Sequence, residues 1–125
     1  MKYLLDSHVL LWSLEQPHRI RASARSIMAQ PGASFVVSVA TVWELAIKQG
    51  LGQLRASANL PDLIRKIGHE ILPVSIEHAW QVRMLPAHHH DPFDRLLVAQ
   101  SQVENIPLIT HDRQLERYDV RIIRA

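Results

Sequence analysis

The sequence predicts an α/β sandwich, in which a central, mainly parallel five-stranded sheet is flanked by helices. Short aliphatic segments alternate with segments of helical spacing, an order typical of β-α-β units. The short segments are continuously apolar, which favours parallel strands covered on both faces. A length of 125 residues suits one hydrophobic core, so a single domain over residues 1–125 is expected.

The predicted strands are short and aliphatic. The first ends at Asp6, and the second follows the chain breaker Pro31-Gly32. In chain order, the five strands are expected at residues 3–5, 35–37, 71–74, 108–110 and 120–123.

The predicted helices lie between these strands, at residues 22–30, 42–49, 60–68, 76–85 and 93–104. Two of them end at a glycine, Gly50 and Gly68, which is the residue favoured just after a last helical turn. The last helix is apolar around most of its circumference, so it is expected to be largely buried against the sheet. The three tryptophans, Trp12, Trp43 and Trp80, are expected in the core or at a protein interface.

Composition places the chain among ordinary globular proteins. It has 14 Lys and Arg residues against 12 acids, and the resulting net charge of +2 does not by itself indicate a nucleic-acid partner. The absence of cysteine excludes disulfides and thiolate chemistry and favours a reducing compartment, so a cytoplasmic location is expected. Asp6 interrupts the first apolar stretch, and no run reaches the ~18 apolar residues of a membrane span. Neither a signal peptide nor membrane insertion is expected.

Four acidic residues have positions that need an explanation. Ligands of an open parallel sheet bind at the carboxyl ends of its strands, and Asp6 and Asp112 follow the first and fourth predicted strands. Glu44 and Asp94 lie inside apolar helical segments, where an unpaired carboxylate is costly to bury.

Each acid taken alone also has a purely structural explanation. The two acids at strand ends can each cap a helix. Thr41 and Glu44 fit a capping box, in which Glu44 reaches back to the backbone of Thr41. Asp91 fits an N-cap followed by Pro92, with Asp94 in the first turn. Capping accounts for Asp91, whereas for Glu44 and Asp94 both explanations stay open.

Taken together, the four acids point to a cation. Carboxylates that meet at one edge of a sheet repel one another and protonate or disrupt the fold unless a cation lies among them. In a chain without cysteine, such hard oxygen ligands select Mg²⁺ or Mn²⁺. Ions of this kind usually meet a phosphate group of the substrate, so the implied chemistry is phosphoryl transfer or phosphodiester hydrolysis.

Each acid belongs to a distinct segment, and the four segments are residues 5–12 (LDSHVLLW), 38–48 (SVATVWELAIK), 90–100 (HDPFDRLLVAQ) and 108–112 (LITHD). In this order and at this chain length they resemble the four motifs of PIN-domain ribonucleases, specifically VapC-type toxins of toxin–antitoxin systems. The resemblance covers about the whole chain, and the second and third segments are its most specific parts. It implies a PIN-like three-layer sandwich.

By motif position, the resemblance assigns catalytic and metal-site carboxylates to Asp6, Glu44, Asp94 and Asp112. Asp6 and Asp94 are the implied direct ligands of Mg²⁺ or Mn²⁺, and Asp112 is more peripheral. Around these acids, two hydroxyl groups and two cations are candidates for orienting a water or contacting the scissile phosphate. They belong to Ser7, Thr110, Lys48 and Arg95. Charges such as the last two more often form exposed pairs on helices.

The resemblance implies a metal-dependent ribonuclease in which water attacks the phosphodiester directly. The 2′-hydroxyl is then not needed as nucleophile, and the products carry a 5′-phosphate and a 3′-hydroxyl. Single-stranded RNA loops are favoured over duplex. A VapB-type antitoxin, whose C-terminal segment blocks the groove, and a homodimer are the implied protein partners.

Two other functions stay open from the sequence. A metal-independent ribonuclease would use a pair of the eight histidines and the 2′-hydroxyl, but it leaves the four acids unexplained. A non-catalytic PIN-like module would bind RNA or a partner without needing all four acids. The consecutive His88, His89 and His90 are expected in a solvated loop, because adjacent side chains seldom converge on one ion, with RNA contact or a pH response by one of them a minor alternative.

The net charge has a second interpretation once the four acids are set aside. Eight acids then face 14 Lys and Arg residues, which gives the rest of the molecule a charge of +6. An acidic, cation-filled pocket within a basic exterior would attract an RNA backbone, and binding would weaken as salt rises.

Overall fold

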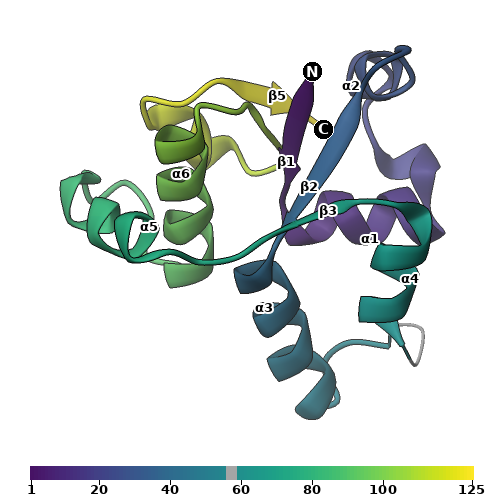
Figure 1. Cartoon of the computed structure of the whole chain (residues 1–125), viewed down its shortest axis with the longest axis horizontal. Helices are drawn as coiled ribbons and strands as arrows, with labels where there is room; N and C mark the ends of the chain where they lie inside the picture. The colour runs from purple at the N-terminus through teal and green to yellow at the C-terminus, as the bar shows by residue number, and fades with distance from the viewer. Residues whose placement is uncertain (56–58) are drawn as a thin grey trace.

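A computed structural model describes residues 1–55 and 59–125 of the chain. Its strands form one sheet in the order β3-β2-β1-β4-β5, and every neighbouring pair is parallel (Figure 1). The strands are β1 (Lys2–Leu5), β2 (Ser34–Ser38), β3 (Glu70–Leu72), β4 (Leu108–Thr110) and β5 (Ile122–Arg124). The predicted α/β sandwich around a parallel five-stranded sheet is therefore confirmed.

Helices cover both faces of the sheet (Figure 1). One side carries α5 (Ile76–Gln81) and α6 (Pro92–Glu104), and the other carries α1 (Ser7–Glu15), α2 (Ala22–Met28) and α4 (Leu60–Ile67). From the carboxyl end of β2 extends α3 (Val39–Gly50). Short 3-10 helices complete the chain: η1 (Pro17–Arg19), η2 (Val82–Met84) and η3 (Arg113–Arg117).

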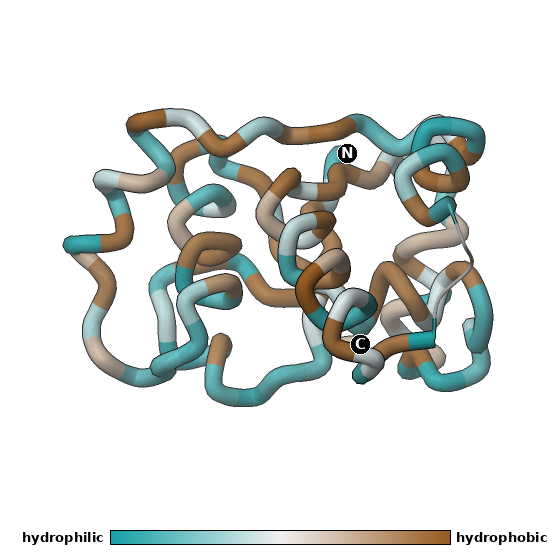
Figure 2. Tube along the Cα trace, turned by 90° about the horizontal axis from the view of Figure 1, so that it is seen from below, coloured by the Kyte–Doolittle hydropathy of each residue, from teal (hydrophilic) through white to brown (hydrophobic). Residues whose placement is uncertain are grey.

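The core has two layers because consecutive strand residues point to opposite faces of the sheet. On the face of α1 and α4, Leu5, Val37 and Ile109 are buried in one apolar cluster. On the face of α6, their neighbours Leu4, Val36 and Leu108 are buried in a second cluster. Hydrophobic segments accordingly pass through the middle of the molecule, and the turns along the lower edge of the view in Figure 2 are mainly hydrophilic.

Two sequence predictions about helices near the site are wrong. The helix expected at residues 42–49 begins at Val39, because Ser38 is its N-cap and the Ser38 hydroxyl accepts the backbone N–H of Ala40 at 3.0 Å. Thr41 and Glu44 therefore lie inside the helix and form no capping box. Residues 7–15 form α1, a helix that the prediction lacks, and Asp6 caps it by accepting the backbone N–H of Val9 at 2.8 Å.

Other element boundaries differ by a few residues. The helix expected at 76–85 is α-helical only to Gln81 and continues as η2, and the helix expected at 22–30 ends at Met28. Gly68 caps α4 in the left-handed conformation, with a φ of 92°. Gly50 does not have this role, because it is the last helical residue of α3 and Leu51 is the cap.

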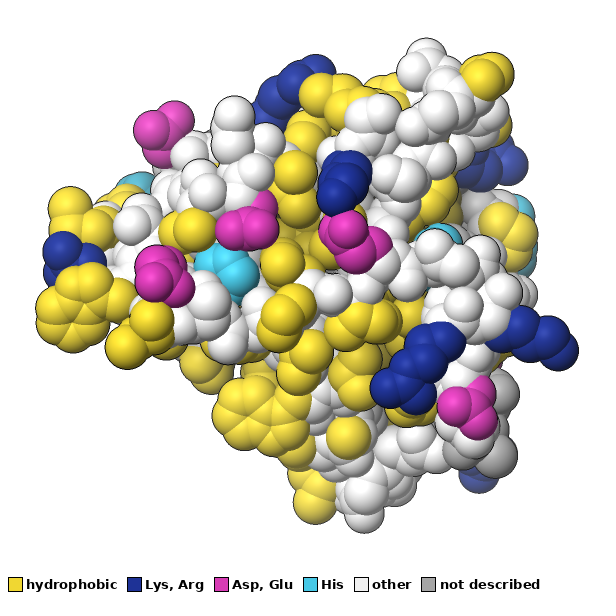
Figure 3. Space-filling view, viewed as in Figure 1, with side chains coloured by type: hydrophobic (Ala, Val, Ile, Leu, Met, Phe, Trp, Pro, Cys, Tyr) yellow, Lys and Arg dark blue, Asp and Glu magenta, His cyan; other side chains and the backbone are white. Residues whose placement is uncertain are grey.

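The surface exposes two of the three tryptophans. Trp43 is 59% exposed and Trp80 is 66% exposed, so the core interpretation is wrong for both. Apolar side chains gather over α3 and over α5 (Figure 3). Within the described ranges, no helix combines the length and apolarity that crossing a membrane requires.

Candidate metal centre

Two of the four acids meet because β1 and β4 are parallel neighbours in the sheet. Asp6 follows β1 and Asp112 follows β4, so both lie at the carboxyl edge. Thr110, the last residue of β4, connects them. Its hydroxyl donates a hydrogen bond to Oδ2 of Asp6 and accepts the backbone N–H of Asp112 at 3.1 Å.

The first turn of α6 supplies the third acid. Asp91 is the N-cap of this helix, as predicted, since its Oδ1 accepts the backbone N–H groups of Phe93 at 2.8 Å and Asp94 at 3.2 Å. The cap places Asp94 in the first turn, on a helix that packs against α3.

Burial and neighbouring carboxylates together raise the pKa of Asp94 from 3.8 to about 7. Burial is the largest cause, and the nearby carboxylates of Asp91, Asp6 and Glu44 add to it, whereas His89 opposes it. Both burial and like charge disfavour the ionised form of a carboxyl group. The acids from β1, α3 and α6 therefore share one region of negative potential.

Glu44 is the fourth acid, and only one of its two oxygens has a hydrogen-bond partner among the described residues. Only 5% of the residue is exposed, and its Oε2 is paired with Nζ of Lys48 at 3.0 Å, one helical turn away. Among the described residues, its buried Oε1 accepts no hydrogen bond. An unsatisfied buried polar atom costs about 1–3 kcal/mol, and a cation beside it would remove that cost.

The residues present therefore fit a divalent cation. The donor set consists of carboxylate oxygens, which Mg²⁺ and Mn²⁺ prefer. Two observations indicate uncompensated negative charge: among the described residues Oε1 of Glu44 has no partner, and burial together with acidic neighbours raises the pKa of Asp94.

His89 belongs to this cluster, contrary to the expected solvated loop. Its Nε2 lies 3.1 Å from Oδ2 of Asp94 and 3.0 Å from Oδ2 of Asp112. His88 and His90 are exposed, as expected. The signal that could have separated the three is distance from the helix cap. Two residues before Asp91, the chain folds back so that the Asp91 N–H meets the His89 ring.

Two of the residues predicted near the acids, one hydroxyl residue and the lysine, line one groove. Ser7 and Lys48 contribute to a groove of about 380 Å³, together with Trp12 and Arg19. The guanidinium of Arg19 lies 4.6 Å from the ring centroid of Trp12. Lys48 is thus both the partner of Glu44 and a wall of this groove.

Arg95 points away from the acids. Its guanidinium donates to the backbone oxygen of Pro86 at 3.0 Å and to that of His89 at 3.4 Å, and it contacts the hydroxyl of Tyr118 at 3.3 Å. Two more carbonyl oxygens, those of Val82 and Leu85, accept from it at 3.4 Å. Arg95 therefore ties the loop before α6 to the helix; the sequence had left a phosphate contact and an exposed ion pair open for it.

His111, the residue between Thr110 and Asp112, contacts the cluster from the other side. Its Nδ1 lies 3.9 Å from Oδ2 of Asp6, and this carboxylate raises the pKa of His111 because it favours the charged imidazolium. The ring also lies against His8, with centroids 4.6 Å apart.

A sequence model of the PIN domain matches residues 3–121. The chain belongs to the PIN domain family. The predicted resemblance is thereby confirmed, and the four acids of this PIN domain come from the four segments that carried the resemblance.

Solved structures share the fold of this PIN domain. VapBC2 from Rickettsia felis, bound to a promoter DNA fragment, has a chain with 16% identity and a TM-score of 0.74, and the match covers 99% of this chain and 98% of that one. DNA-bound VapBC from Salmonella typhimurium gives 17% identity, a TM-score of 0.72 and the same coverage. FitAcB from Neisseria gonorrhoeae gives 20% identity, a TM-score of 0.65, and coverage of 97% and 96%. No curated protein sequence matches this PIN domain.

Proposed function

We propose that this PIN domain, a single unit over residues 1–125, is a metal-dependent ribonuclease and the toxin of a VapBC-type pair. It would act in the cytoplasm and inhibit translation or growth. One observation carries the proposal: four acids gather at one sheet edge, where Oε1 of Glu44 has no partner among the described residues and Asp94 has a pKa of about 7. Its structural neighbours are chains of VapBC and FitAB complexes, which supports the toxin assignment.

Asp6 and Asp94 would hold the cation, with Glu44 and Asp112 beside it. Oδ1 of Asp6 accepts the backbone N–H of Val9, and Oδ2 accepts the hydroxyl of Thr110. Each oxygen keeps a lone pair for a cation. When bound, Mg²⁺ or Mn²⁺ supplies Lewis acidity at the phosphate and lowers the pKa of a water.

Side chains of the protein would accept the proton of the attacking water and hold the accepting group in position. Oε1 of Glu44 is available to accept the proton of the attacking water, because it accepts no hydrogen bond from any described residue. Lys48 holds the other oxygen of Glu44 in place. The bond from water oxygen to phosphorus forms as the bond to the 3′ oxygen breaks, and the 3′ oxygen takes a proton from solvent. The products carry a 5′-phosphate and a 3′-hydroxyl.

The substrate and partners follow from the surfaces beside the acids. The groove lined by Ser7, Trp12, Arg19 and Lys48 offers cations and an aromatic face, which suit the backbone and bases of single-stranded RNA. A VapB-type antitoxin would block this groove. The exposed apolar surfaces over α3 and α5, which include Trp43 and Trp80, are suited to the antitoxin and to a second copy of the chain in a homodimer.

The decisive experiment combines metal control with sequencing of RNA ends. Purified protein is incubated with total RNA in Mg²⁺, in Mn²⁺ and in EDTA, and the 5′-phosphate ends are sequenced with an Asp94→Asn variant as control. Defined new ends are expected only with metal and only from the wild type. Cleavage that survives EDTA would favour the histidine mechanism, and RNA binding without any cleavage would favour the non-catalytic module.

A further inference from the structure

Hydrogen bonds hold both the backbone and the ring of His89. Its backbone N–H donates to the hydroxyl of Tyr118 at 2.9 Å, and its carbonyl oxygen accepts from Arg95 at 3.4 Å. Its Nδ1 accepts the backbone N–H of Asp91 at 3.2 Å. Backbone and ring are therefore both oriented before any ligand arrives.

The Asp91 contact decides which ring nitrogen carries the proton. A backbone N–H can only donate, so Nδ1 of His89 must be the acceptor and the neutral ring carries its proton on Nε2. This N–H then lies between two acceptors, Oδ2 of Asp94 at 3.1 Å and Oδ2 of Asp112 at 3.0 Å.

The same contact argues against His89 as a metal ligand. A ligating histidine binds through an unprotonated nitrogen and donates its other N–H to an acceptor. If Nε2 of His89 bound a cation, the proton would have to move to Nδ1, where it would face the Asp91 N–H. The ring is built to donate to the acids rather than to join them.

We infer that His89 is a positioning residue, whose Nε2–H bridges the carboxylates of Asp94 and Asp112 and sets their separation for a divalent cation. The inference rests on the proposed function. One ligand atom from each of the three residues lies within 4.8 Å of the others, a distance at which two bare carboxylates repel each other strongly. The bridging donor offsets this repulsion and brings the peripheral Asp112 to the centre.

Three substitutions at His89 distinguish the loss of the Nε2–H donor from the loss of the ring's volume. The amide nitrogen of Gln can reach the position of Nε2, whereas the shorter amide of Asn reaches only that of Nδ1, and Leu has no donor. Mn²⁺ affinity is measured by calorimetry without RNA. His89→Asn and His89→Leu should each weaken Mn²⁺ binding about tenfold or more, whereas His89→Gln and the exposed control His90→Gln should stay within about threefold of the wild type.

A second measurement uses the unmodified protein and does not depend on activity. Nitrogen-15 NMR of the metal-free wild type should show the neutral His89 ring protonated at Nε2. A proton on Nδ1 would overturn the inference, as would equal Mn²⁺ affinity in the Gln, Asn and wild-type proteins, or an equal loss with Gln, Asn and Leu. Any of these results, with metal-dependent RNA cleavage intact in the wild type, would leave the proposed function standing. A wild type that neither binds Mn²⁺ nor cleaves RNA would end the proposed function, whichever tautomer is found.

Discussion

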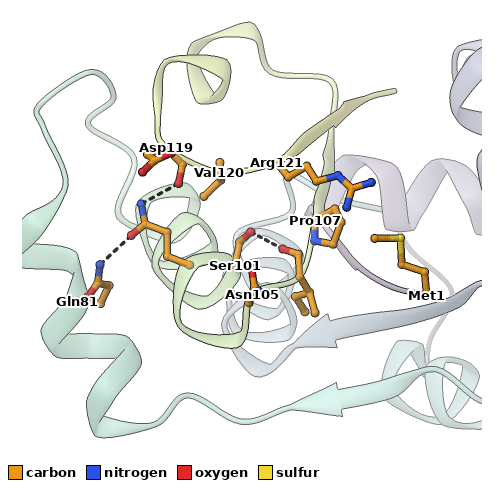
Figure 4. A pocket seen from close by; sticks show the side chains of 10 residues that line it. Met1, Gln81, Ser101, Asn105, Pro107, Asp119, Val120 and Arg121 are labelled. Carbon is orange, nitrogen blue, oxygen red and sulfur yellow. Dashed lines mark hydrogen bonds between the residues drawn. The ribbon is translucent and has the colours of Figure 1, made fainter.

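The amino and carboxyl edges of the sheet differ in how completely their polar and charged groups are paired. At the amino edge, Met1, Pro107 and Arg121 line a hollow of about 640 Å³ (Figure 4). One lining side chain there is paired at both ends, since Gln102 accepts from Gln81 at 2.9 Å and donates to the carbonyl oxygen of Asp119 at 3.3 Å. At the carboxyl edge, the groove is smaller, about 380 Å³, but buried acids crowd together beside it.

The difference shows that size is a poor guide to chemistry in this molecule. Among the described residues, no side chain that lines the larger hollow (Figure 4) has a buried polar atom without a hydrogen-bond partner. At the carboxyl edge, by contrast, the buried Oε1 of Glu44 has no partner in the described part of the chain, and the pKa of Asp94 is raised. Uncompensated charge, rather than volume, therefore marks the candidate site.

Asp94→Asn should have the largest effect, and it should act on activity and stability in opposite directions. Asn keeps the size of the side chain but removes a charge, so RNA cleavage should fall at least about a hundredfold. Because ionised Asp94 is disfavoured by its neighbours, the metal-free variant should melt at a higher temperature than the wild type at pH 8. Cleavage assays and thermal melts check both, and full activity in the folded variant would remove Asp94 from the site.

Arg95→Lys distinguishes a clamp on the loop from a phosphate contact. Lys keeps the charge but cannot reach several carbonyl oxygens at once, so the loop that carries His89 should lose its anchor. Mn²⁺ affinity should fall about tenfold. Arg83→Lys, at an exposed arginine of the neighbouring turn, is the matched control. Unchanged Mn²⁺ affinity, together with weaker RNA binding, would instead support a phosphate contact.

The metal-free protein should lose stability as the pH rises from about 4 to about 7. Asp94 has a pKa of about 7 in the folded chain against 3.8 as its ordinary value, so the folded state holds a proton that the unfolded state has lost. Stability falls with pH wherever the folded state binds more protons. Mg²⁺ or Mn²⁺ should therefore raise the melting temperature more at pH 8 than at pH 5. Calorimetric melts of the wild type and Asp94→Asn would test this, since the variant should lack most of the slope.

Gln102→Ala should have the smallest effect, because it alters only the amino edge. It removes two hydrogen bonds of partly exposed groups, so the free energy of unfolding should fall by no more than about 1–2 kcal/mol. Cleavage and Mn²⁺ affinity should stay within about twofold of the wild type. A tenfold loss of cleavage would show that the two edges are coupled.

The strands and the motif acids could be predicted from the sequence because their signals are local. Continuous apolar runs such as 35–37 and 108–110 indicate buried parallel strands whatever the neighbouring elements are. In such a sheet the carboxyl ends of strands share one edge, so Asp6 and Asp112 could be placed together without coordinates. The cap at Asp91 was equally local, since it depends on its own helix alone.

The start of α3 could not be predicted in the same way. Ser38 and Thr41 are both acceptable N-caps by residue type. Ser38 is the N-cap in the structure, because β2 ends there and the chain turns directly into the helix. This cap places Glu44 inside the helix, paired with Lys48 through Oε2.

His89 shows most clearly what only the tertiary structure decided. In the sequence it is one of three consecutive histidines, and their one local difference, the distance from the cap Asp91, does not indicate which groups the ring of each contacts. Its role depends on Asp94 from α6 and Asp112 from the end of β4, which packing alone brings within hydrogen-bond distance. The sequence by itself indicated which acids gather at the carboxyl edge, because the buried parallel strands and the four acidic segments are local patterns. The structure decided how those acids are held, because a bridging hydrogen bond requires side-chain positions that no spacing along the chain encodes.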